Sequence, residues 1–303
     1  MIRYPKALNE IDEAMDAEAP GWLSRARERI QLFELLGRYV EEYKDEHGNS
    51  VKLPPFWGEV KQVYMRRQHS KCIYCESSLE GGATGRIQWD LEHFRPKGSI
   101  AKWPGNDSAI RYEFDTGSAS KSGYYLLAYH PRNYAAACKT CNSPFKHIYF
   151  PIAGARVQHG RNPEDYDSEQ PFLVYPLGDG DDPEDLITFF GAEAFPRYRP
   201  DEDQYKSRRG QVIIDLFGLN REPLVRNRAW WLRYCVWNIY TKAAAGDVLG
   251  MEDLELILSN RSSFVSCARR FVDLCRTDRA AAEAMLPALK RIVEIFDGEP
   301  SYR

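Results

Sequence analysis

The chain lacks long apolar runs, and this absence limits the class of protein. The longest apolar runs in its 303 residues span only a few positions, so we expect no membrane-spanning segment. The first twenty residues lack the apolar core of a signal peptide and are acidic after Lys6, so we expect a cytoplasmic protein. Internal repeats and an H-x-E motif are also absent, and without that motif a zinc deaminase has little support.

An excess of positive charge is missing too. A net charge of -3 and a pI near 6.1 exclude a globally basic protein that coats DNA. The hydrophobic share of 43% excludes global disorder. The charge is uneven, however: residues 61–150 hold 13 Lys/Arg against 7 Asp/Glu, whereas residues 151–200 hold 4 against 10. The middle of the chain therefore suits a polyanionic partner and the following segment does not.

Residue patterns divide the chain into four consecutive segments and predict an α+β fold that is mostly helical. The predicted segments are an N-terminal helical segment (1–60), a cysteine-bounded module (61–151), an acidic, proline-rich connector (152–203) and a C-terminal helical region (204–303). Within them we expect a helix over 19–46, a loop over 45–55, a short helix over 56–70 and a strand over 171–177.

Cysteine spacing is the most specific signal in the sequence. Four of the seven cysteines form two C-x2-C pairs 62 residues apart, Cys72/Cys75 and Cys138/Cys141. Without a secretion signal such pairs indicate metal ligands, and four thiolates bind zinc tetrahedrally at about 2.3 Å in closed, structural sites. The other three fit core positions of predicted helices: Cys235, Cys267 and Cys275.

An acid and a base stand side by side between the two cysteine pairs. The carboxylate of Glu92 suits Mg²⁺ or Mn²⁺, and a neutral His93 imidazole suits proton abstraction from water. Neighbouring side chains on a strand point to opposite faces, so a bend or hairpin is needed to bring both to one site. Asn142 follows Cys141 directly, and its amide oxygen could be a second ligand; His147, five residues later on a helix, would lie off the same line.

This order of motifs resembles the HNH, or ββα-metal, nuclease family, whose small core is stapled by zinc in a treble-clef-like arrangement. The resemblance implies that Glu92 and Asn142 bind the catalytic metal and that His93 is the general base. It also implies that Asn133 holds the loop and orients His93. Two positions depart from the commonest pattern: Glu92 replaces Asp, and Asn142 replaces the final His. Both variants suit an oxygen-ligated metal.

A narrower resemblance covers roughly residues 60–230. The EHFRPK run, the YPLGDGDDPEDLITFFG run and the LFGLNREPLVRNR run are similar to the HNH nucleases of bacterial antiphage systems of the Septu and retron-associated types. That resemblance implies a defence role beside an ABC-type ATPase. The C-terminal helices lie outside the resemblance; from their aromatic content and position we expect them to bind a partner, form an oligomer or position the nucleic acid. We expect that nucleic acid to be DNA, with RNA or tRNA left open.

Four basic residues flank the Glu92-His93 pair and could contact phosphates: Arg95, Lys97, Lys139 and Lys146. The alternative reading is a non-catalytic, zinc-stabilised module that binds nucleic acid or protein. A pure binding module has no need for Glu92, His93 and Asn142 in this arrangement, so the sequence favours the nuclease.

Overall fold

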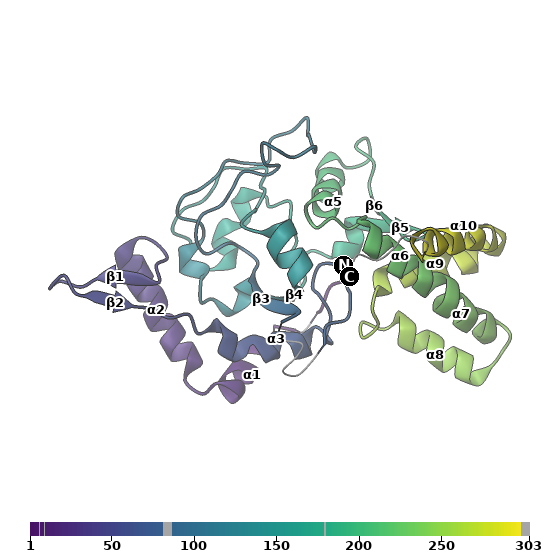
Figure 1. Cartoon of the computed structure of the whole chain (residues 1–303), viewed down its shortest axis with the longest axis horizontal. Coiled ribbons are helices and arrows are strands. Elements are labelled where there is room, and N and C mark those ends of the chain that lie inside the picture. The colour runs from purple at the N-terminus through teal and green to yellow at the C-terminus, as the bar shows by residue number, and fades with distance from the viewer. Residues whose placement is uncertain (6, 9, 81–86, 179, 298–303) are drawn as a thin grey trace. The chain divides into compact units, whose positions relative to one another are not determined.

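The computed structural model describes residues 1–5, 7–8, 10–80, 87–178 and 180–297, and the chain divides into two units. The hairpin unit comprises Tyr4–Ser70 and Leu79–Gly180, and the helical unit comprises Met1–Arg3, Lys71–Ser78 and Asp181–Arg303. The described residues form helices and three two-stranded sheets, which confirms the mixed α and β content expected (Figure 1). Both units are discontinuous in sequence, whereas the four predicted segments are consecutive.

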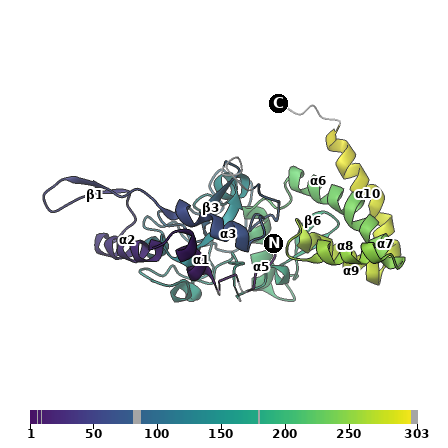
Figure 2. The ribbon, with the colours of Figure 1, turned by 90° about the horizontal axis from the view of Figure 1, so that it is seen from below.

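The hairpin unit opens with two helices and a small antiparallel sheet. These elements are α1 (Ile11–Glu18), α2 (Trp22–Leu36), β1 (Glu42–Lys44) and β2 (Ser50–Lys52). The helix expected over 19–46 is therefore too long, because Gly37 adopts a left-handed φ of 65° and ends α2. The loop expected over 45–55 contains β2, which pairs with β1 through a turn at Gly48. In Figures 1 and 2 this β1–β2 hairpin stands out from α2.

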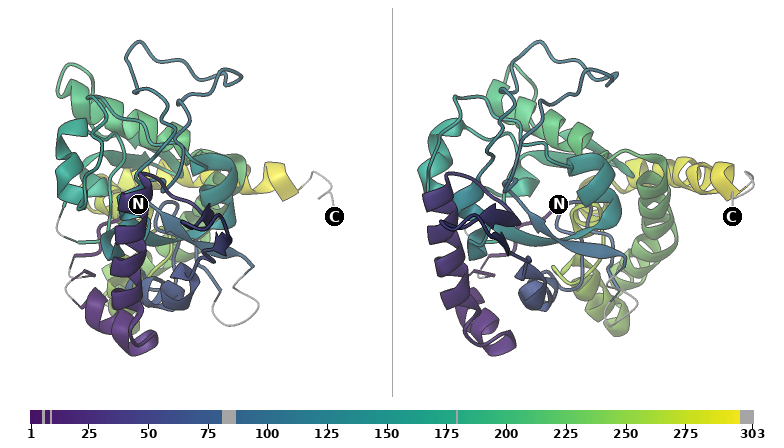
Figure 3. Two further views of the ribbon diagram at one scale, coloured as in Figure 1. Left: turned by 90° about the vertical axis from the view of Figure 1, so that its left-hand side faces the viewer. Right: turned by 60° about the vertical axis from the view of Figure 1, so that its left-hand side comes forward.

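A second antiparallel pair, β3–β4, forms the centre of the hairpin unit. The elements around it are 3₁₀ turns η1 (Trp57–Val60), η2 (Tyr125–Leu127), η3 (Pro131–Asn133) and η5 (Pro163–Glu169), helix α3 (Lys61–Arg67), strands β3 (Trp89–His93) and β4 (Tyr134–Cys138), and the π-helix η4 (Cys141–Lys146). The helix expected over 56–70 is confirmed as η1 and α3. Between β3 and β4 the chain makes the long irregular excursion that Figure 3 shows in blue-green.

The register of β3 against β4 places Glu92 opposite Ala135 and His93 opposite Tyr134. At the other edge of β4, a side chain takes the place of a strand within the described part of the chain. The buried Gln68 amide donates to the Ala136 carbonyl at 2.8 Å and accepts from the Ala136 N–H at 2.7 Å. Gln68 thereby satisfies the two main-chain groups that a third strand would otherwise pair.

The helical unit packs its helices around an apolar core. Its elements are η6 (Pro183–Asp185), β5 (Ile187–Phe190), β6 (Glu193–Pro196), α5 (Gln204–Leu216), α6 (Glu222–Trp230), the π-helix η7 (Trp231–Val236), α7 (Trp237–Ala244), α8 (Val248–Leu258), α9 (Val265–Thr277) and α10 (Arg279–Asp297). Helix α10 packs on α6 and α9, and α7 packs on α8 (Figure 2). The apolar face that includes Cys267 and Cys275 is buried in this core, as the helical spacing predicts.

Two further observations bear on the sequence predictions. The strand expected over 171–177 is wrong: the segment makes only the isolated bridges Ile152–Pro171 and Tyr4–Leu177, because a proline lacks the N–H that a ladder needs. Among the described helices, none is both long enough and apolar enough to cross a membrane.

We expect Gln68→Ala to weaken the β3–β4 pair, because it leaves the buried N–H and C=O of Ala136 without partners. The cost should be about 2 to 6 kcal/mol, since each of the two unsatisfied buried groups costs about 1 to 3 kcal/mol. Native-state hydrogen exchange of the β4 amides measures it. Gln211→Ala removes an exposed glutamine whose amide donates to Asp215, and it is the matched control. Equal protection of β4 in both variants would contradict this role of Gln68.

Candidate metal centre and catalytic pocket

The four cysteines predicted from C-x2-C spacing come together. The Sγ atoms of Cys72, Cys75, Cys138 and Cys141 all lie within 4.8 Å of one another. The Cys141 N–H donates to Cys138 Sγ at 3.4 Å, which stabilises a thiolate. Tetrahedral Zn–S bonds of about 2.3 Å require sulfurs at about this spacing. The residues therefore suit a metal such as zinc, and a donor set of four thiolates is typical of structural sites.

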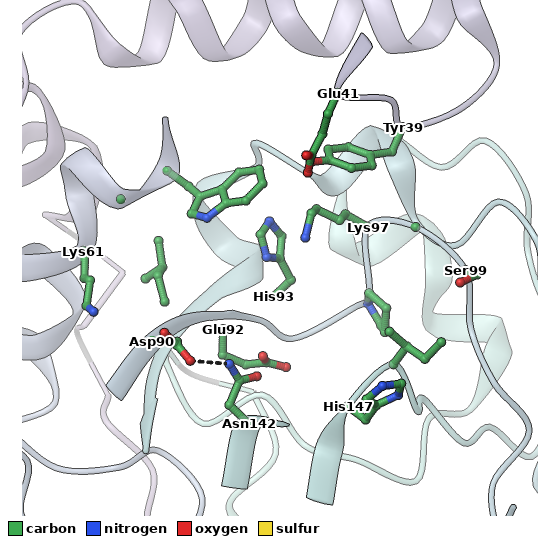
Figure 4. A pocket seen from close by; sticks show the side chains of 16 residues that line it. Tyr39, Glu41, Lys61, Asp90, Glu92, His93, Lys97, Ser99, Asn142 and His147 are labelled. Atoms are coloured by element: carbon green, nitrogen blue, oxygen red, sulfur yellow. Dashed lines mark hydrogen bonds between the residues drawn. The ribbon is translucent and has the colours of Figure 1, made fainter. Parts of the chain in front are cut away.

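A pocket of about 580 Å³ lies beside β3, and it collects the predicted catalytic residues. Glu92, His93 and Asn142 all line it, together with Asp90 and Lys97. In Figure 4 Glu92 lies with Asp90 and Asn142 on one side of β3, whereas His93 lies with Lys97 on the other. Adjacent strand residues thus alternate as expected, and both still line one pocket because His93 is the last residue of the strand.

His93 is held in a defined tautomer. Its Nε2 lies 3.0 Å from the Ala128 carbonyl oxygen, which can only accept, so Nε2 carries the proton and Nδ1 keeps a lone pair. The ring packs edge-on against Trp57 and Tyr134, with ring centroids 4.9 and 5.0 Å away. Burial, reinforced by the Lys97 charge, holds the pKa of His93 well below its ordinary value. The imidazole is therefore neutral at pH 7 and can accept a proton at Nδ1.

The Glu92 carboxylate is buried, with 5% of its surface exposed, and forms an ion pair with Lys146. Lys146 Nζ lies 2.6 Å from Glu92 Oε1 and donates to the His93 carbonyl at 3.1 Å. Burial raises the pKa of Glu92, and Lys146 opposes that shift. A carboxylate has more acceptor positions than Lys146 uses, so Glu92 retains the capacity to bind a cation.

Arg95 and Lys146 do not have the position expected of phosphate contacts, and this corrects the sequence prediction. Both side chains are buried. Lys146 is paired with Glu92, and Arg95 Nη1 lies 2.7 Å from the buried Glu169 carboxylate. Buried charges require such partners, so these two cations are structural. The sequence could not reveal the Arg95 partner, which lies 74 residues away.

Among the described residues, the Asn133 side chain bonds main-chain atoms. Its Oδ1 accepts from the Arg95 N–H at 2.8 Å, and its Nδ2 donates to the carbonyls of Arg95 and Leu127 at 3.0 Å each. The residue thus ties the chain after β3 to η2, one residue before the Ala128 carbonyl that faces His93. Asn133 is buried and does not line the pocket described above.

Lys97 and Lys139 have positions that could meet a phosphate. Lys97 lines the pocket, with Nζ 4.7 Å from the Trp57 ring centroid and 5.3 Å from that of Tyr39, and burial lowers its pKa. Lys139 is half exposed and its Nζ lies 2.7 Å from Asp90 Oδ1. Both remain candidates for nucleic-acid contacts.

His147 and Asp90 lie at the pocket although sequence reasoning set the first aside and missed the second. Residues 141–146 form a π-helix, in which position i bonds i+5, and the His147 N–H donates to the Asn142 carbonyl at 2.8 Å. His147 ends this helix with a positive φ of 46°, so the projection of an α-helix does not apply to its side chain. Asp90 shares a strand face with Glu92, so the i, i+2 alternation was a usable signal.

The arrangement combines hard oxygen donors, a neutral imidazole and cations around one pocket. Such a set suits divalent-metal binding and proton abstraction from water. Comparisons of the chain with protein-family models, with curated proteins and with solved structures gave no match.

We expect the purified chain to carry about one zinc ion, and Cys138→Ser to lose most of it, because zinc prefers four thiolates in a closed site. Elemental analysis by mass spectrometry measures the ratio. Cys235→Ser removes a cysteine outside the cluster and should retain the metal. The same zinc content in all three proteins would refute the site.

Proposed function

We propose that the protein is a metal-dependent endonuclease of the HNH type that hydrolyses phosphodiester bonds, with DNA as the preferred substrate class. The observation that carries the proposal is the shared pocket: Glu92, His93 and Asn142 line it beside a two-stranded antiparallel sheet that leads into a helix. The order of strand, strand and helix, with Cys138 and Cys141 where the second strand meets the helix, is the arrangement that the family resemblance implies.

The residues fit a divalent cation such as Mg²⁺ or Mn²⁺. Glu92 offers carboxylate oxygens and Asn142 an amide oxygen, and Figure 4 draws the two groups turned toward one another. Hard cations prefer such oxygen donors over nitrogen or sulfur. A bound cation would supply charge stabilisation at a non-bridging phosphate oxygen and at the leaving 3′ oxygen.

The chain's own residues would act as follows. His93 Nδ1 takes a proton from a water molecule, whose oxygen attacks phosphorus as the bond to the 3′ oxygen breaks. The 3′ oxygen leaves as an alcohol after protonation by solvent, and the products carry a 5′-phosphate and a 3′-hydroxyl. The Ala128 carbonyl keeps the proton on Nε2, so that Nδ1 is the accepting atom throughout. Lys97 and Lys139 would hold the flanking phosphates.

The setting we propose is bacterial antiphage defence in the cytoplasm, beside an ABC-type ATPase. It rests on the resemblance to Septu-type and retron-associated nucleases. Exposed apolar side chains on α8 and α6, among them Leu249, Leu256 and Trp230, are compatible with a partner or oligomer contact in the helical unit. A zinc-stabilised module that binds without cutting is the competing reading, and the following assay separates the two.

We expect His93→Ala to reduce cleavage by about 10² to 10⁴-fold, because general-base catalysis contributes that much. Plasmid DNA, single-stranded DNA and RNA are each incubated with the protein and with Mg²⁺, Mn²⁺ or EDTA. Each reaction is run with and without ATP and a cell extract that contains the ATPase partner. His47→Ala removes an exposed histidine in the β1–β2 hairpin and should cut as the wild type does. Zinc content and circular dichroism should be the same in all three proteins.

Two results would contradict the proposal. Metal-dependent cutting by His93→Ala at the wild-type rate would refute the role of His93. A wild-type chain that binds nucleic acid but cuts none of the three substrates under any of these conditions would favour the binding module.

A further inference from the structure

Asp90 lies in the catalytic pocket, and the mechanism above gives it no task. It stands two residues before Glu92 on β3, on the same side of the strand (Figure 4). Its Oδ2 accepts from Asn142 Nδ2 at 3.1 Å, and its Oδ1 is paired with Lys139 Nζ at 2.7 Å. Both carboxylate oxygens are therefore engaged by neighbouring donors.

The bond to Asn142 decides which way the amide faces. A carboxamide has an oxygen on one side and an NH₂ group on the other, and the two orientations are nearly alike in shape. An ionised carboxylate only accepts hydrogen bonds, so Asp90 holds the nitrogen of Asn142 toward itself. The amide oxygen is then turned toward the Glu92 carboxylate, as Figure 4 draws it.

We propose that Asp90 is a positioning residue that fixes the Asn142 amide with its oxygen directed to the divalent cation held with Glu92. The inference rests on the proposed function for the existence of that cation. Without Asp90 the amide could rotate and present its NH₂ group, which repels a cation. Lys139 offsets the Asp90 charge, so the main contribution of Asp90 is orientation and not added negative charge.

Mn²⁺ binding measured by calorimetry and by electron paramagnetic resonance tests the assignment in the full-length, zinc-loaded chain. All variants carry His93→Ala, so that no turnover interferes. Asp90→Ala should weaken Mn²⁺ binding about 10 to 100-fold, the usual effect of losing a residue that orients a metal ligand. Asp90→Asn should also weaken it, because an amide at 90 can donate to the Asn142 oxygen and no longer selects one orientation.

Lys139→Ala is the matched control, because it removes the other partner of Asp90 and leaves the bond to Asn142 intact. Its Mn²⁺ affinity should change by less than about fivefold, the scale of an exposed ion pair. A double-mutant cycle of Asp90→Ala and Asn142→Ala then tests whether Asp90 acts through Asn142. If Asp90 acts through Asn142, then Asp90→Ala has no further effect once Asn142→Ala is present.

Three results would overturn the inference, and they are distinguishable. Wild-type affinity in Asp90→Ala, with affinity lost in Glu92→Ala, would refute the role of Asp90 and leave the proposed function intact. An equal loss on both Asn142 backgrounds would show that Asp90 acts directly on the cation. Mn²⁺ binding that Glu92→Ala does not alter, or no binding at all, would refute the metal site and with it the proposed nuclease chemistry.

Discussion

The antiparallel pairing of β3 with β4 is the interaction on which the pocket lined by Glu92, His93 and Asn142 depends. Its register sets Glu92 against Ala135 and His93 against Tyr134, and the end of β4 delivers Cys138 and then the π-helix that carries Asn142. A slip of one residue would exchange the two faces of β3 and remove Glu92 from Asn142. The register is held from both edges, by β3 itself and by the Gln68 amide.

Buried charge shapes the surroundings of that sheet. The Arg95–Glu169 and Lys146–Glu92 pairs each place opposite charges in the protein interior. Desolvation makes such pairs a weak source of stability, but breaking one leaves an uncompensated buried charge. We interpret them as constraints on arrangement: Glu169 holds the chain that follows His93, and Lys146 holds the Glu92 carboxylate at the pocket.

Local patterns predicted the parts of the molecule in which neighbouring residues decide the structure. C-x2-C spacing predicted the four-cysteine cluster, and helical periodicity predicted the buried face of α9. The same periodicity predicted a helix that continues past Gly37, because the apolar spacing continues where the backbone adopts a left-handed φ. The charge pattern also predicted that Arg95 contacts phosphates, since a buried ion pair depends on a partner distant in sequence. The π-helical turn at Asn142 and the positive φ of His147 carry no local signal that we could identify, so the position of His147 at the pocket was not predicted.

The three bonds of Asn133 all end on main-chain atoms, and this has a consequence for sequence variation. The constraint acts on the path of the chain and is indifferent to the side chains at positions 95 and 127. The Arg95 side chain is constrained separately, by its buried ion pair with Glu169. The amide itself has no substitute of equal reach, because it must accept once and donate twice within one small space. Asn133 therefore fixes the path of the chain whichever side chains stand at positions 95 and 127.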